Sequence, residues 1–238
     1  MSETPSDTSS PQRTRGEHSR MLFALLTVAA VAVGFLAGFL ARVPFEDSAP
    51  AAPEAGSVDV GFAQDMIVHH DQGVEMAAVA IANSGDDRIR NIAYDILTTQ
   101  QNQIGQMQGW LSLWGQPLLP TGEYMTWMTE SGGHDHGGHG TATNAEGASD
   151  SHLMPGMATS EDLANLRAAR GPELDVLFLQ LMLRHHEGGL PMMEYGEQYA
   201  STAAVRNLAG TMVATQQGES DLMRTLLAER GAEPLPLN

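Results

Sequence analysis

The sequence predicts an all-α protein, a four-helix bundle made of two tandem helical hairpins and preceded by one N-terminal transmembrane helix. Residues 62–113 align with residues 178–229 without a gap, at a constant offset of 116, and each copy contains two long amphipathic segments. One helical hairpin buries little apolar surface by itself. Two related hairpins packed about a pseudo-twofold axis therefore predict a four-helix bundle.

The N-terminal region predicts a membrane anchor. Residues 21–41 carry no charged side chain and, as a helix, span roughly 31 Å, which is enough to cross the hydrocarbon core of a bilayer. The positive-inside rule places the N-terminus in the cytoplasm, because Arg13, Arg15 and Arg20 precede this run and Arg42 alone follows it closely. The rest of the chain is then expected outside the cytoplasm, attached to the cell membrane.

Two flexible segments are expected on either side of the anchor. Residues 1–20, rich in Ser, Thr and Pro, predict a disordered cytoplasmic tail, and residues 43–57, rich in Ala and Pro, predict a linker. A cleaved signal peptide is the alternative to a retained anchor, since small residues follow in "SAPAAPEAG". Its apolar region would normally be only about 7 to 15 residues long, so we favour the anchor.

Composition excludes several classes of protein. The formal net charge is −17 and all 12 basic residues are Arg, so most of the surface would repel the phosphates of nucleic acid. Cysteine is absent, which excludes disulfides, thiolate metal sites and cysteine catalysis. Any site for a soft metal ion must therefore use Met and His.

The two hairpins are predicted at residues 58–114 and 159–232. The turn "NSGDD" separates the two helices of the first hairpin. In the second hairpin, "TSEDLANLRAAR" carries a capping-box pattern, and "GP" at residue 171 restarts the helix after a break. Pro191 is expected to kink that helix, because proline removes a backbone donor and collides with the preceding turn.

The connection between the hairpins, residues 115–158, is rich in Gly, Ser and His, and we expect it to be largely disordered without a ligand. It supplies the predicted accessory metal ligands: His134, His136, His139, His152, Met154 and Met157. The two thioethers around the Pro-Gly turn of "MPGM" could enclose a soft ion together with His152. The alternative is a solvated low-complexity linker that binds divalent ions weakly.

A doubled stripe of His and Met, in "MIVHHDQGVEM" and "MLRHHEGGLPM", carries the main functional signal. At about 100° per residue, Met66, His69, Gly73 and Met76 share one narrow stripe of the helix. If the pseudo-twofold axis brings the two copies together, two imidazoles and up to four thioethers converge inside the bundle. The predicted metal ligands are Met66, His69, His70, Met76, Met182, His185, His186 and Met192.

The donor types in these stripes favour copper. Thioether sulfur and imidazole nitrogen suit monovalent copper, whereas a site without carboxylates would hold magnesium, calcium or manganese poorly. Zinc normally takes a tetrahedral set of N, S or O ligands, and no such set is evident. The competing interpretation is that the methionines are core packing and that the histidines are satisfied by side chains or water.

Three carboxylates are predicted to support this site from a second layer: Asp65, Asp71 and Glu187. Asp65 precedes His69 by one helical turn and is expected to accept a hydrogen bond from its ring, although Leu181 takes its place in the second copy. A di-iron site would instead need inward Glu residues and Glu-x-x-His motifs, and the chain contains no Glu-x-x-His.

At these residues the chain resembles a bacterial family known as domain of unknown function 305 (DUF305). The corresponding stretches are "FAQDMIVHH", "TTQQNQIGQM", "MPGMATSEDLANLRAARGPELDVLFLQLMLRHH" and "TQQGESDLM", and the resemblance covers about residues 58–230. It implies a ferritin-like four-helix bundle, usually exported or membrane-anchored. It also implies a link to copper binding and copper tolerance, which would carry over to the eight predicted His and Met ligands.

We therefore expect a membrane-anchored, extracytoplasmic protein that binds copper as Cu(I) for sequestration or transfer, with no organic cofactor and no catalytic residues. The expected partners are the membrane, through residues 21–41, and the metal ion, with an envelope protein or a second copy as further candidates. The alternative is a non-catalytic interaction module that docks on a membrane or envelope complex, its histidines being structural. A copper-dependent redox enzyme would require turnover with oxygen or peroxide, which nothing in the sequence demands.

Overall fold

The computed structural model describes residues 15–42, 51–128 and 153–238, which belong to two compact units, Met1–Ala51 and Ala52–Asn238. All regular elements in these ranges are helical, and no strand occurs among the residues described. The all-α prediction is therefore confirmed. Four predicted accessory ligands lie outside the described residues, and their role stays a prediction: His134, His136, His139 and His152.

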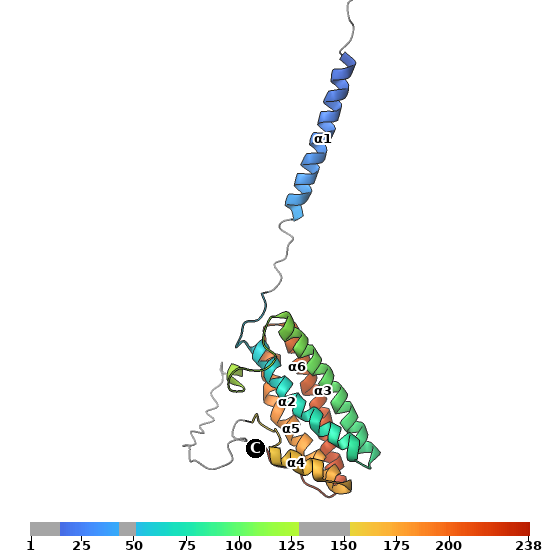
Figure 1. Cartoon of the computed structure of the whole chain (residues 1–238), viewed down its shortest axis with the longest axis vertical. Helices are drawn as coiled ribbons and strands as arrows, with labels where there is room; N and C mark the ends of the chain where they lie inside the picture. The colour runs from blue at the N-terminus through green and yellow to red at the C-terminus, as the bar shows by residue number, and fades with distance from the viewer. Residues whose placement is uncertain (1–14, 43–50, 129–152) are drawn as a thin grey trace, which may run out of the picture. The chain divides into compact units, whose positions relative to one another are not determined.

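The first unit contains one described helix, α1 (Arg15–Arg42) (Figure 1). Its stretch Ser19–Phe39 has a mean hydropathy of 2.4, and its large apolar side chains are exposed. A helix of this length and composition is able to cross a membrane, either as a retained anchor or as a signal sequence. The predicted apolar helix is therefore present.

The second unit is a bundle of four long helices, α2 (Val58–Asn83), α3 (Asp87–Leu113), α5 (Gly171–Tyr199) and α6 (Ala203–Glu229) (Figure 1). α2 and α3 form one hairpin, α5 and α6 form the other, and α2 packs against α5 across the centre. Two short elements complete it, α4 (Ser160–Ala168) against α2 and α5, and the 3-10 turn η2 (Thr126–Met128) against α2. The predicted bundle of two tandem hairpins is confirmed.

Local sequence signals set the start of the second hairpin. Thr159 and Asp162 form the reciprocal capping box of α4 that the sequence predicts. α5 then begins at Gly171 with Pro172 in its first turn, where the missing backbone N–H is tolerated. Pro191 lies inside α5, which continues as one helix from Gly171 to Tyr199.

Hydrogen bonds repeat between the hairpins at the same offset as the sequence. Each second helix ends in a Schellman motif at a glycine with a left-handed φ, such as Gly115 (φ +67°) at the end of α3. Beyond that motif, Gln64 of α2 donates to the Pro117 carbonyl at 2.8 Å. In the second hairpin Gln180 of α5 donates to the Glu233 carbonyl at 2.6 Å. Each hairpin is thus held closed by the same long-range bond.

Each hairpin also closes the turn of the other. Asp59 of α2 accepts hydrogen bonds from the Ser201 N–H (2.8 Å), the Ser201 hydroxyl (2.9 Å) and the Thr202 N–H (2.9 Å). Its repeat counterpart Asp175 of α5 accepts one from the Ser84 hydroxyl at 2.6 Å. Burial would raise the pKa of Asp59, but the hydrogen bonds from Thr202 and Ser201 lower it below its ordinary value.

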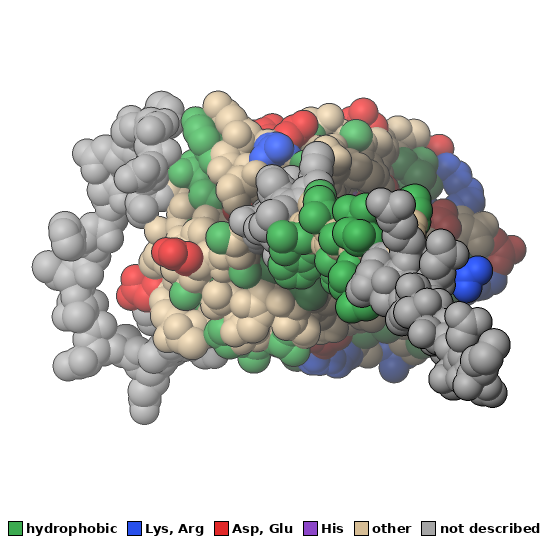
Figure 2. All heavy atoms as spheres, turned by 90° about the horizontal axis from the view of Figure 1, so that it is seen from above, with side chains coloured by type: hydrophobic (Ala, Val, Ile, Leu, Met, Phe, Trp, Pro, Cys, Tyr) green, Lys and Arg blue, Asp and Glu red, His purple; other side chains and the backbone are tan. Residues whose placement is uncertain are grey.

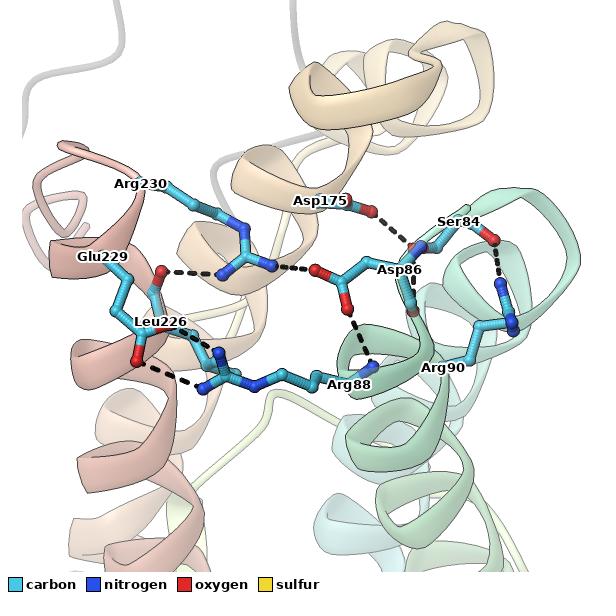
Figure 3. Close-up of polar contacts among 8 residues, drawn as sticks. All are labelled: Ser84, Asp86, Arg88, Arg90, Asp175, Leu226, Glu229 and Arg230. Carbon is cyan, nitrogen blue, oxygen red and sulfur yellow. Dashed lines mark hydrogen bonds and ion pairs between the residues drawn. The ribbon is translucent and has the colours of Figure 1, made fainter.

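Charged side chains link α3 to α6 at the end of the bundle that holds the α2–α3 turn. Figure 3 shows Arg230 donating to Asp86 at 2.5 Å, and Arg88 donating to Glu229 at 2.6 Å. Asp86 also caps α3 by accepting from the Arg88 N–H at 2.8 Å. These pairs are partly exposed, so their stabilising effect comes from the network and the cap rather than from any single pair.

The apolar core divides into two clusters along the bundle. One cluster contains Met76 from the end of α2 and Met182 from the start of α5. The other contains Met66 from the start of α2 and Met192 from the end of α5. Because α2 and α5 run in opposite directions, the middle turns of both helices lie between the two clusters.

The connection between the hairpins is more ordered at its ends than predicted. Trp127, in η2, is buried with its ring edge against Phe62, at a centroid distance of 6.1 Å. Residues 153–158 pack on α5, where a Cβ on Gly188 would lie 2.4 Å from the Cα of Gly156. Burial of large apolar side chains outweighs the polar composition at both ends, so the prediction of a largely disordered connection is wrong for residues 115–128 and 153–158.

The cross-hairpin carboxylates generate a prediction about stability. Asp59→Asn should lower the free energy of unfolding of residues 52–238 by roughly 2–3 kcal/mol, because charge-assisted bonds to two backbone donors and one hydroxyl are weakened. The matched variant Asp175→Asn, which affects one hydroxyl donor, should cost only about 1 kcal/mol. Urea unfolding at neutral pH measures both values, and an equal loss in the two variants would contradict this account.

Candidate metal centre

Four histidines form a buried layer where α2 crosses α5. His69 and His70 come from α2, His185 and His186 come from α5, and all four are 0% exposed. On the face of the molecule in Figure 2 no histidine side chain of the described residues is visible, as this burial requires. The layer lies in the middle turns of the two helices, between the two apolar clusters.

The central pair, His69 and His185, brings the two sequence copies into contact. Their ring centroids are 3.8 Å apart with an angle of 33° between the ring planes, and His185 Nε2 donates to the His69 carbonyl at 2.8 Å. His69 Nε2 makes a longer bond, 3.4 Å, to the carbonyl of Pro155. Gly189 permits this packing, since a Cβ there would lie 2.9 Å from His69 Cε1.

The outer pair has partners on the second helix of each hairpin. His70 Nε2 donates to Gln103 Oε1 of α3 at 2.8 Å, and His186 Nε2 donates to Glu219 Oε2 of α6 at 2.6 Å. Gln103 and Glu219 occupy equivalent positions of the repeat. One half of the layer therefore has an amide partner, and the other has a carboxylate that makes a stronger, charge-assisted bond.

These bonds fix which ring nitrogen carries a proton. Carbonyl, amide and carboxylate oxygens only accept, so each Nε2 carries a proton, and in a neutral ring Nδ1 then presents a lone pair. All four Nδ1 atoms are buried without a hydrogen-bond partner in the described part of the chain. An imidazole whose N–H is held by an acceptor and whose other nitrogen is free is the usual arrangement of a metal-ligating histidine.

Further unpartnered polar atoms surround this layer. Both amide atoms of Gln100, Gln216 Oε1 and Ser220 Oγ are buried without a partner among the described residues. Gln100 fills the space that Gly73 leaves open, because a Cβ on Gly73 would lie 2.3 Å from Gln100 Oε1. Unsatisfied buried polar groups are uncommon in proteins, so these atoms and the four Nδ1 atoms call for a partner that the described residues do not supply.

Burial keeps His69, His70 and His185 neutral. It lowers the pKa of His69 to about 4, that of His70 to about 3, and that of His185 well below 6.5. The neighbouring rings lower these values further, since like charges would repel. At neutral pH the Nδ1 lone pairs are therefore available to a metal ion without prior loss of a proton.

The predicted methionine ligands are all buried but are not gathered around one point. Met66 and Met192 belong to one apolar cluster, Met76 and Met182 to the other, and the histidine layer lies between the clusters. Each pair combines one methionine from each sequence copy. The expected convergence of two imidazoles is confirmed by the ring contact, whereas the four thioethers divide into one pair on each side of the layer.

The predicted supporting carboxylates have other partners. Asp65 does not serve His69: it accepts from the Met125 N–H at 2.6 Å and from Trp127 Nε1 at 2.7 Å, so it anchors η2. That prediction was wrong because one helical turn of spacing does not reveal a donor from a distant segment. Asp71 lines a surface pocket of about 770 Å³, and Glu187 pairs with Arg224 at 2.6 Å.

The "MPGM" turn covers the histidine layer. Met154 and Met157 are buried in the cluster that contains Met66, and their predicted role as thioether ligands together with His152 stays a prediction, because His152 lies outside the described residues. Gln72 holds the turn by a pair of hydrogen bonds to the backbone of Ala158, at 2.6 and 2.9 Å. The turn thus shields His69 from solvent while its Pro155 carbonyl orients the ring.

The donor set fits a soft ion of low coordination number better than it fits zinc or a di-iron centre. Among the described residues no group of three or more His, Asp or Glu side chains is arranged to hold a metal ion. Two neutral imidazoles, with thioethers in the adjoining clusters, are nevertheless the donor types that monovalent copper prefers. The stacked rings of His69 and His185 would have to turn about their side-chain bonds for both Nδ1 atoms to face one ion.

Sequence reasoning missed the residues that orient the rings, namely Gln103, Glu219 and the Pro155 carbonyl. Gln103 and Glu219 share the repeat offset but differ in type, so a search for identical residues passes over them. The available signal was a polar residue at both positions, one in each copy of the repeat. The Pro155 carbonyl leaves no signal, because backbone groups are present at every position.

Acid should destabilise the metal-free protein through these histidines. An unfolded histidine takes up a proton near pH 6.5, whereas folded His69 does so only near 4. Between these values the unfolded state binds more protons, so the stabilisation is complete above about pH 6.5 and is lost as the pH falls, by about 3 kcal/mol for His69 alone. Urea unfolding between about pH 7.5 and pH 5 should show about 2 kcal/mol of this loss for His69, because pH 5 lies above the folded pKa.

The control for this pH dependence is His70→Gln, whose amide can still donate to Gln103. It removes one of the depressed pKa values and should give a shallower fall in the free energy of unfolding with acid. If the parent and the variant lose the same free energy over this pH range, the histidine layer does not govern acid stability.

Gly189→Ala should destabilise the bundle by roughly 1–2 kcal/mol, because His69 is held between α5 and the His185 ring and cannot retreat from the new methyl group. The matched control is Gly218→Ala, a helical position with nothing within 4 Å of the new Cβ. There the better helix propensity of Ala should stabilise by up to about 1 kcal/mol. Thermal unfolding compares them, and two stabilised variants would be inconsistent with this packing.

Comparisons with known proteins agree on one family. The sequence profile of DUF305, a domain of unknown function, matches residues 59–227. A DUF305 crystal structure from Streptomyces coelicolor is 38% identical over 77% of this chain and 98% of its own, with a TM-score of 0.65. A DUF305 fragment from Deinococcus radiodurans is 28% identical over 76% of this chain and 99% of its own, with a TM-score of 0.57.

A more distant similarity concerns the fold alone. The protein CopM in its Cu(I)-bound form is 18% identical over 72% of this chain and 96% of its own, with a TM-score of 0.52. A search of curated proteins gives no match. The profile match across most of the chain and the closer structural relatives show that this chain belongs to the DUF305 family.

Proposed function

We propose that the protein binds Cu(I) in the histidine layer of its bundle, for sequestration or transfer outside the cytoplasm, and that α1 is a retained membrane anchor. The observation that carries this proposal is the set of four buried imidazoles with Nε2 held by acceptors and Nδ1 unpartnered. Such a set is costly to bury unless a ligand satisfies it. Copper supplies that compensation.

His69 and His185 are the proposed central ligands, since their rings are in contact and both belong to the repeated stripe. Met66 and Met192 lie in the adjoining cluster and would supply thioethers from the same two helices. Neutral imidazole and thioether ligands add no charge to compensate a divalent ion, which favours the monovalent one. Exchange of such ligands one at a time suits transfer rather than catalytic turnover.

Copper and silver in related structures support the choice of metal. CopM has been solved in Cu(I)-bound, Cu(II)-bound and silver-bound forms, with TM-scores of 0.52, 0.53 and 0.50 against this chain. Silver is, like Cu(I), a soft monovalent ion. The acidic surface of this chain, with a formal net charge of −17, would add a salt-sensitive attraction for cations.

The proposal predicts loss of Cu(I) affinity when the central pair is changed. An anaerobic titration of residues 52–238 with Cu(I), against a chromophoric competing chelator, compares the parent with His69→Gln/His185→Gln. Glutamine keeps an amide donor and similar volume, so the bundle should fold. Loss of the hydrogen-bond partner of a metal ligand weakens metal binding by up to about a hundredfold. Removing two ligands themselves should therefore weaken Cu(I) binding by more than about a hundredfold.

A matched control changes the four accessory histidines of the connection to Gln: His134, His136, His139 and His152. This control should keep the tight site and lose only weak, additional copper. Circular dichroism verifies that both variants remain helical. Unchanged affinity in a helical His69→Gln/His185→Gln protein would reject the histidine layer as the copper site and favour the interaction-module alternative.

A further inference from the structure

One end of the bundle carries an exposed apolar surface, here called the end patch. It consists of the end of α3 and the segment after it: Trp110, Leu113, Trp114, Leu118 and Leu119. Leu113 is 81% exposed and Leu119 is 58% exposed. Positions 110, 113 and 114 share one face of α3, and the partly exposed rings of Trp110 and Trp114 stack at a centroid distance of 6.2 Å.

The end patch lies in a long uncharged part of an otherwise acidic chain. No charged residue occurs between Asp95 and Glu123, although the protein has 29 acidic residues and 12 basic ones. Exposed Leu beside Trp, without charges, is the composition of protein surfaces that enter the interfacial region of a bilayer. Ordinary soluble surfaces intersperse charges among such side chains.

The second repeat provides an internal comparison, because the same structural positions lie at the opposite end of the bundle. Leu113 and Trp114 correspond to Glu229 and Arg230 at the offset of 116. Those two residues form the ion pairs with Arg88 and Asp86 that Figure 3 shows. The equivalent positions of the second repeat therefore carry charged side chains, and the largely exposed Leu113 is not required to build the bundle, whereas Trp114 also packs against the core.

The chain enters the bundle at the end patch. Gln116 Nε2 donates to the Pro53 carbonyl at 3.2 Å, so the start of the second unit lies beside Trp114 and Leu118 of the end patch. Residues 43–52 connect Pro53 to the last residue of α1, and a segment of this length spans at most roughly 40 Å when fully extended. A bilayer that holds α1 is thus within reach of the patch.

We propose that the end patch inserts into the interfacial region of the membrane that holds α1. This inference rests on the anchor in the proposed function and is independent of copper. The apolar side chains supply the attraction, since the acidic surface repels anionic headgroups. Insertion would orient the bundle with the α2–α3 turn and its ion pairs away from the lipid.

Vesicle binding of residues 52–238 tests the proposal without the anchor. This unit is compact by itself. The match to the Streptomyces structure includes 98% of that chain but only 77% of this one, so a relative that lacks the remaining part is folded. Phosphatidylcholine vesicles should shift the tryptophan emission to the blue, and brominated acyl chains should quench it. Vesicles with added phosphatidylglycerol should bind less protein at low salt.

The decisive variant is Leu113→Glu/Trp114→Arg, which introduces the residues of the second repeat. It should bind phosphatidylcholine vesicles at least about tenfold more weakly while circular dichroism shows that it remains helical, with a lower unfolding temperature because Trp114 packs partly against the core. Leu222→Glu, at a half-exposed position on α6, is the matched control and should bind like the parent. Copper affinity should be unchanged in both variants.

Several results would overturn the proposal. They are absence of vesicle binding by the parent, equal binding by Leu113→Glu/Trp114→Arg, or binding that requires anionic lipid. A parent that forms a dimer, with no vesicle binding and with dissociation on Leu113→Glu/Trp114→Arg, would reassign the patch to self-association. Light scattering on the same samples distinguishes this last result.

Discussion

Burial of four imidazoles at the crossing of α2 and α5 is the constraint on which the rest of the structure depends. It divides the apolar core into two clusters and requires an acceptor for each Nε2 from four different places in the chain. It also requires glycine at 189, where any side chain would meet the His69 ring. A polar layer of this kind weakens the core, so its retention is explained by function more readily than by stability.

The pseudo-twofold repeat builds the frame, and departures from it mark the specialised places. The hairpin-closing bonds of Gln64 and Gln180 are the same on both sides, as are the Schellman motifs. There are two departures. Gln103 of the first copy is replaced by Glu219 at the equivalent position of the second, which makes the two halves of the layer unequal. Asp65 anchors a turn that the second hairpin lacks. The repeated fold tolerates such changes, because both residues of an equivalent pair, such as Gln103 and Glu219, occur in the same kind of helical position.

The described end of the connection, residues 153–158, covers the histidine layer. Its "MPGM" turn is held by Gln72, by the close approach of Gly156 to Gly188, and by Asn238, which bonds the backbones of Gly156 and Met157. Met154 and Met157 add buried apolar contacts to these bonds, so the turn is packed as part of the bundle.

The sequence by itself determined the helices, the apolar N-terminal segment and the residues of the stripe, because helical periodicity, caps and a gap-free repeat are local signals. It also allowed the contact of His69 with His185 to be expected, since a pseudo-twofold axis brings equivalent positions together. Only the tertiary structure decided the ring tautomers, the division of the methionines between two clusters and the true partners of Asp65. Those depend on which distant backbone and side-chain groups packing brings within hydrogen-bond distance, and no local pattern encodes that choice.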